Sequence, residues 1–144
     1  MTITVKILGA FLSSMCFSVV FRVQKQYLCY CGIAGAVGWS IYLLSDSLGA
    51  SAVFANFLAS LGAAAASQAF ARIFKAPATV FYIPGILPMV PGASIYKAAF
   101  YMIQQDQQLS NYYLVETLQI AGVIAIGIFL VDSFFRLTLT KKKA

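Results

Sequence analysis

Pro84-Gly85-Ile86-Leu87-Pro88-Met89-Val90-Pro91-Gly92 interrupts a chain that otherwise has the composition of membrane-spanning helices. The stretch holds three of the four prolines in the sequence. Because proline lacks a backbone donor and clashes with the preceding turn, a straight helix cannot continue through these residues. Lipid cannot satisfy the freed backbone groups, so such a break persists only against protein or a water-filled cavity. The stretch therefore predicts non-helical backbone at membrane depth.

The composition is that of a polytopic membrane protein. Of the 144 residues, 61% are hydrophobic and 10% are charged, whereas a soluble domain carries about 25% charged residues. The sequence has no histidine and only four acidic residues, so we expect no enzyme activity, no metal site and no cofactor. The net charge of +6 comes largely from short basic clusters. Such clusters set membrane orientation and do not indicate nucleic-acid binding.

Five apolar segments are long enough to cross a bilayer, which takes about 20 residues per helix. They predict an all-α integral membrane protein with about five transmembrane helices and a single transmembrane domain over residues 1–144. The fourth helix is broken by the Pro/Gly-rich stretch, and the polar run Gln104–Gln108 is expected to be a loop. The predicted spans are residues 3–22, 27–45, 50–71, 77–103 and 112–135.

Charge placement predicts how the chain is oriented. Lys and Arg residues follow the first, third and fifth spans, whereas the loops around Asp46 and Asp106 contain none. The positive-inside rule then places the N-terminus outside and the C-terminus in the cytoplasm. This arrangement needs an odd number of crossings, so we expect residues 77–103 to cross fully. The alternative is a re-entrant loop, which would leave the terminal lysines outside.

The broken crossing is the first candidate for substrate binding. We expect two half-helices, Ala78–Ile83 and Ala93–Ile103, with unusual dihedral angles at Gly85 and Gly92 between them. The unpaired amides that begin the second half-helix attract carboxylates, and the carbonyl end of the first suits an ammonium group or a cation. Secondary transporters often bind substrate in this way, although a kinked helix whose prolines only shape packing is the alternative. The candidate residues are Gly85, Pro88, Pro91, Gly92 and Ser94.

Charged and polar residues outside the stretch extend the candidate site. Lys97 and Glu116 are expected at similar depth near the outer surface. They predict either a simple ion pair, or a pair in which Lys97 binds a carboxylate and Glu116 accepts a proton; Lys97 alternatively snorkels to the surface. In the third span Asn56 and Ser60 share a face with Ser67. That stripe either lines a polar pathway or hydrogen-bonds a neighbouring helix.

Three further patterns have structural interpretations. The glycines of the second span favour close packing of helices. Asp132 and Arg136, four residues apart, predict an ion pair at the cytoplasmic end of the last span. The tail Lys141-Lys142-Lys143 is expected to contact anionic membrane lipid.

One set of residues in and around the broken segment has the form of a family signature. It consists of Arg72, Pro77, Ile83-Pro84-Gly85-Ile86, Pro88-Met89-Val90-Pro91-Gly92, Tyr96 and Asp106. This set resembles the signature of the threonine/serine exporter family, with Met89 in place of a leucine. In length and number of spans the whole chain is similar to the family's short, YjjB-like subunits.

The resemblance implies a bacterial inner-membrane exporter of threonine and serine, or of dicarboxylates such as succinate. It also implies a longer, YjjP-like membrane partner that supplies the other membrane half and a cytoplasmic portion. The small size and the lack of an internal repeat agree with a subunit, because many carriers are built from two related halves. Two alternatives stay open, a homo-oligomeric small-solute channel and a non-transporting membrane scaffold.

Overall fold

The computed structural model describes residues 2–143, with side chains characterised through Thr138. These residues form α-helices and two short 3-10 helices, and contain no β-strand. Four helices are long and apolar enough to cross a membrane, and a bent pair brings the number to five. The predicted all-α membrane fold is confirmed. In chain order the elements are α1 (Ile3–Val20), η1 (Lys25–Tyr27), α2 (Leu28–Ser47), α3 (Ala52–Phe74), α4 (Thr79–Ile86), η2 (Leu87–Met89), α5 (Gly92–Ile103) and α6 (Gln107–Lys143).

Helix α2 lies at the centre of the bundle and packs against α1, α3 and α4. Its glycines permit this close packing, as the sequence predicts. A Cβ atom on Gly35 would collide with the Ser14 hydroxyl of α1, and one on Gly32 would lie 2.7 Å from the ring of Phe11. Gly85 of α4 approaches the same helix so closely that its Cβ would be 3.1 Å from that of Ala34. The small residues therefore let both α1 and α4 approach the backbone of α2 closely.

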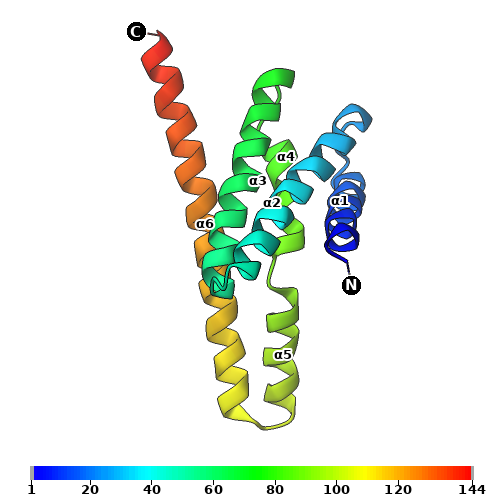
Figure 1. Cartoon of the computed structure of the whole chain (residues 1–144), viewed down its shortest axis with the longest axis vertical. Helices are drawn as coiled ribbons and strands as arrows, with labels where there is room; N and C mark the ends of the chain where they lie inside the picture. The colour runs from blue at the N-terminus through cyan, green and yellow to red at the C-terminus, as the bar shows by residue number, and fades with distance from the viewer. Residues whose placement is uncertain (1, 144) are drawn as a thin grey trace.

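Helix α6 is longer than the predicted span 112–135. Its 37 residues extend for about 55 Å at 1.5 Å per residue, whereas the hydrocarbon core is only about 30 Å thick. Its C-terminal part packs on α3 and its N-terminal part on α5. Figure 1 shows α5 and the beginning of α6 as a hairpin that extends past the turn between α2 and α3.

The prediction of a loop over Gln104–Gln108 is wrong for its last two residues, which are helical. Helix α6 already begins at Gln107, because Asp106 caps it. The Asp106 carboxylate accepts a hydrogen bond from the Leu109 N–H at 3.1 Å, and its carbonyl accepts one from the Ser110 N–H. An aspartate at this position satisfies amides that the first helical turn leaves unpaired.

The break in the fourth span lies later than predicted. The first half-helix was expected to end at Ile83, but α4 continues through Pro84 to Ile86, and η2 extends it to Met89. The chain breaks at Val90–Pro91, and α5 starts at Gly92, within one residue of the predicted start. Unusual dihedrals at Gly85 and Gly92 were also wrongly predicted. Gly49 is the only glycine with a positive φ among the described residues.

The two halves of the broken span are bent relative to each other. The α4–η2 segment and α5 differ by 48°, and such a bent pair is either a broken span or a re-entrant loop. Full crossing by residues 77–103 therefore stays a prediction. The orientation of the termini stays a prediction. The predicted lipid contact of Lys141-Lys142-Lys143 concerns side chains beyond Thr138, which the structure does not describe.

Candidate functional site

A hydrogen bond between α5 and α6 marks the candidate site. The Ser94 hydroxyl, in the first turn of α5, donates to the Glu116 carboxylate at 2.9 Å, and the contact is partly buried. No side chain caps the start of α5, where Pro91 is the N-cap residue. The Glu116 carboxylate therefore lies near the positive end of the α5 dipole, a position that stabilises negative charge.

Lys97 does not form the predicted ion pair with Glu116. Its ammonium group instead lies 5.1 Å from the centroid of the Tyr113 ring, a cation–π geometry. The antiparallel register of the hairpin explains the difference, because it sets Lys97 opposite Tyr113 and Ser94 opposite Glu116, one turn further along. A hydrogen bond of 2.9 Å from the Ser110 hydroxyl to the Ala98 carbonyl fixes this register.

A cleft of about 580 Å³ adjoins Glu116 between the first turn of α3 and the N-terminal part of α6. Its volume is within the range of about 300–1,000 Å³ typical of ligand sites. Glu116 is its only charged lining residue, and four further lining residues are polar. The lining consists of Ser51, Ala52, Val53, Gln108, Asn111, Tyr112, Val115, Glu116 and Gln119.

The chemistry of this cleft suits a small zwitterion. The Glu116 carboxylate can accept hydrogen bonds from an ammonium group. The N-terminus of α3 borders the same space, and the positive end of its dipole favours a carboxylate. Sequence reasoning missed this contribution of α3, although Ser51 gave a signal. A serine before an apolar run predicts an N-cap, and the Ser51 hydroxyl does accept from the Phe54 N–H at 3.3 Å.

The polar stripe of α3 is buried, and its side chains form hydrogen bonds with carbonyl groups of α3 itself. Asn56 donates to the Ala52 carbonyl at 2.8 Å, and Ser60 to the Phe57 carbonyl at 2.7 Å. The predicted hydrogen bonds to a neighbouring helix are therefore absent for these two side chains. Ser60 instead fills the notch left by Gly127 of α6, where a Cβ would collide with its hydroxyl. In this structure Ser60 of the stripe packs α3 against α6.

The residues of the break are not gathered at the Ser94–Glu116 pair. Gly85 is buried against α2. Pro88 lines a separate cleft of about 280 Å³ together with Lys6 and Trp39. Pro91 is half-buried and Gly92 is exposed at the start of α5. The roles assigned to these residues from sequence stay predictions.

A second polar cluster connects the other ends of α3 and α6. The ion pair between Asp132 and Arg136 is confirmed, with an N–O distance of 2.8 Å. Gln68 of α3 donates to the same carboxylate at 2.9 Å. Arg72 donates to the Phe135 carbonyl at 3.1 Å, and its guanidinium lies 4.4 Å from the centroid of the Phe135 ring. These contacts fasten the C-terminal part of α6 to α3. In the described part of the chain, no three His, Cys, Asp or Glu side chains are grouped as metal ligands would be.

A family model described as "Threonine/Serine exporter, ThrE" matches residues 6–134. The chain belongs to the threonine/serine exporter family. The matched range contains the whole broken span and both members of the Ser94–Glu116 pair, and it confirms the resemblance inferred from the Pro/Gly-rich stretch. Together with the apolar helices it shows a multi-pass membrane transporter of the threonine/serine exporter type. No solved structure matches this chain.

Proposed function

We propose that this chain is the short membrane subunit of a bacterial inner-membrane exporter for threonine and serine or for succinate-like dicarboxylates. Its C-terminus lies in the cytoplasm, and a longer, YjjP-like partner completes the transport path. The observation that carries this proposal is the Ser94–Glu116 hydrogen bond beside the 580 Å³ cleft. Within it, Glu116 holds the substrate ammonium, and the N-terminus of α3 faces the substrate carboxylate.

The packing of α5 supports the need for a partner. Along its length α5 packs mainly against α6, and large apolar side chains on its other sides are exposed, with Tyr96 at 68% and Ile103 at 83%. A transport path beside this hairpin lacks a wall on those sides. A second polypeptide, inserted in the same membrane, supplies that wall.

The choice between cargo classes follows from charge. Glu116 attracts an ammonium group, which threonine and serine carry and succinate lacks. The cleft next to Glu116 therefore favours amino acids, whereas a dicarboxylate relies on Lys97 and on the helix N-termini. Threonine and serine are the first substrates to test.

The experiment is an export assay in cells that express the chain together with a longer, YjjP-like partner. Cells are loaded with threonine, serine or succinate, and the rate of appearance outside is measured. We expect export above that of cells with the empty vector. Glu116→Gln should reduce amino-acid export about tenfold or more, since hydrogen bonds to charged groups contribute about 1.5–3 kcal/mol.

Thr117→Val is the matched control for that substitution. Thr117 follows Glu116 directly, but its hydroxyl bonds only the Tyr113 carbonyl of its own helix, at 2.7 Å. Export should be preserved in this variant at equal abundance in the membrane. Equal export by wild type and Glu116→Gln would contradict the assigned site. Export by the chain without any partner, from a homogeneous ring, would favour the channel alternative.

A further inference from the structure

A cleft of about 600 Å³ lies at the opposite end of α3 from Glu116. It is bounded by the turn after α1, the turn after α3, and α4. Apolar side chains make up much of its wall, and no aspartate or glutamate lines it. Its lining includes Phe21, Val23, Tyr27, Val80, Ile83 and Pro84, with Arg22 and Lys75 among the remaining residues.

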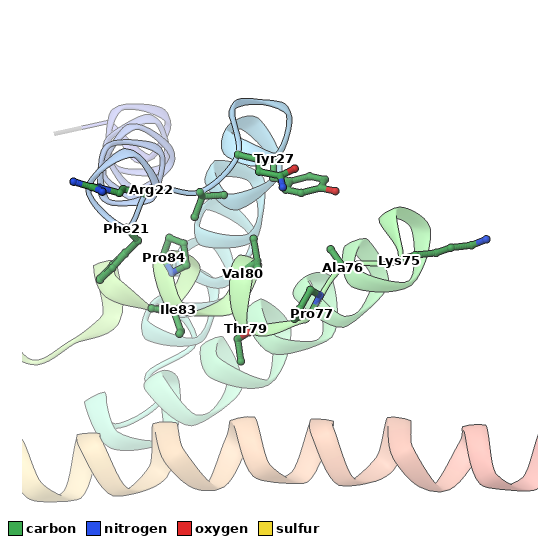
Figure 2. Close-up of a pocket in the computed structure, with 12 residues that line it drawn as sticks. Phe21, Arg22, Tyr27, Lys75, Ala76, Pro77, Thr79, Val80, Ile83 and Pro84 are labelled. Atoms are coloured by element: carbon green, nitrogen blue, oxygen red, sulfur yellow. The ribbon is translucent and has the colours of Figure 1, made fainter.

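The two basic residues lie on opposite rims of this cleft. Figure 2 shows their side chains directed outward on either side, with Pro84 and Val80 between them. Both side chains are exposed. Long basic side chains of this kind can lay their methylene stems along apolar surface and turn the charge toward an anion at the membrane surface.

The backbone at both positions is unusual for a basic residue. Arg22 has a φ of 55° and Lys75 a φ of 52°, and Gln105 is the only other non-glycine with a positive φ in the described range. Helices commonly end in this left-handed conformation, and glycine or asparagine is the usual residue there. At two helix ends beside one cleft, a basic residue thus occupies a left-handed position that favours glycine.

We propose that this cleft binds an anionic phospholipid. Its phosphate lies near Arg22 and Lys75, and the part of an acyl chain next to the headgroup lies against Val80, Ile83 and Pro84. Basic pockets between membrane helices are a common way to hold anionic headgroups. Three observations support this ligand: two positive charges, no opposing carboxylate among the lining residues, and an apolar wall. A small soluble anion would use the charges and leave the wall unused.

A bound lipid would add to contacts that already join the turn after α1 to the end of α3 and to α4. Tyr27 meets the rings of Phe74 and Phe81 edge-on, at centroid distances of 5.4 and 5.3 Å. A headgroup phosphate at the rim of the cleft would add a contact to the turns that carry Arg22 and Lys75, at the start of the broken span. The lipid would then stabilise α4, and this role does not depend on which substrate is exported.

The test uses the purified full chain in detergent with added phosphatidylglycerol or phosphatidylcholine, and native mass spectrometry counts the lipids retained. We expect several-fold more phosphatidylglycerol than phosphatidylcholine. The double variant Arg22→Gln/Lys75→Gln should lower retention of phosphatidylglycerol about five- to twenty-fold, given the attraction of each basic residue to anionic lipid. Lys25→Gln, a basic residue of the same turn outside the cleft lining, should leave retention unchanged.

Two further arms make the result decisive. Thr79→Phe places a ring in the cleft and leaves both charges, so it should also lower retention, even where the double variant is too unstable to purify. Glycerol phosphate, added instead of lipid, should not raise the melting temperature as phosphatidylglycerol does. Equal retention of both lipids, an equal loss in Lys25→Gln, unchanged retention in Thr79→Phe, or equal stabilisation by glycerol phosphate would each overturn the proposal.

Discussion

The thiol of Cys31 donates a hydrogen bond to the carbonyl oxygen of Val80 at a distance of 3.4 Å. Val80 precedes Pro84 by four residues, so its carbonyl is the one that the missing proline N–H leaves without a helical partner. Cys31 is fully buried, and its thiol takes the place of the missing helical partner. This contact explains how α4 continues through a proline and why the break in the span moves to Val90–Pro91.

Replacing the Cys31 donor should therefore destabilise the broken span. Cys31→Val keeps an apolar side chain of similar size but leaves the Val80 carbonyl unpaired, at an expected cost of about 1–3 kcal/mol. Cys31→Ser retains a donor and serves as the control. The melting temperature of the purified protein in detergent measures the difference. A Cys31→Val variant as stable as Cys31→Ser would show that the carbonyl finds another partner.

The packing role of Ser60 predicts a rescue experiment. Gly127→Ala should lower the melting temperature, because the new methyl group collides with the Ser60 hydroxyl; overpacking of this kind costs about 1–3 kcal/mol. Gly122→Ala is the control on the same helix, where a Cβ meets no atom within 4 Å. The double variant Ser60→Gly/Gly127→Ala should recover part of the loss. If Gly122→Ala and Gly127→Ala behave alike, the contact between α3 and α6 is not as described.

The contact between Arg72 and Phe135 predicts a local change in dynamics. Arg72→Gln removes the guanidinium from the Phe135 ring, an interaction of about 0.5–1 kcal/mol at an exposed site. Hydrogen exchange of the α6 amides near Phe135 should become faster, while that of the α5–α6 hairpin stays unchanged. Arg72→Lys should give an intermediate result, because lysine keeps the charge and loses the planar group. A uniform change in hydrogen exchange along the whole of α6 would contradict a local role for the contact between Arg72 and Phe135.

The carboxylate-binding role predicted for Lys97 implies a requirement for positive charge at residue 97. Lys97→Met should abolish export while the protein stays in the membrane, and Lys97→Arg should retain most of it, since arginine also stacks on aromatic rings. Tyr113→Phe keeps the ring beneath the charge and should behave as wild type. Unchanged export in Lys97→Met would remove this residue from the transport mechanism.

The sequence predicted the number, order and approximate bounds of the helices because apolar length and charged turns determine them. The start of α6 was missed since Asp106 lies in a run of glutamines that has the composition of a loop, and its capping role depends on local geometry. The position of the break was missed for a different reason. The partner of the Val80 carbonyl is Cys31, 49 residues away in the sequence, and nothing near Pro84 indicates it.

The candidate site was predicted in its residues but not in its contacts. Lys97 and Glu116 were singled out from charge and depth in the membrane, and Ser94 from its place at the start of the second half-helix. Their pairing depends on the register of α5 against α6, which Ser110 and Ala98 fix and which periodicity alone does not determine. For Asn56 and Ser60 the sequence could not decide between two roles. A polar face on a helix has the same sequence pattern whether it lines a transport path or packs against a neighbouring helix.

Flux from reconstituted vesicles tests the central claim, that this chain is the short subunit of a threonine/serine exporter, most directly. Vesicles are loaded with labelled threonine or serine and contain the chain alone, a longer YjjP-like partner alone, or both. We expect substrate efflux only with both subunits, and loss of efflux when the Glu116→Gln variant replaces the wild-type chain. Absence of efflux from vesicles that contain both assembled subunits, or equal efflux from the chain alone, would contradict it.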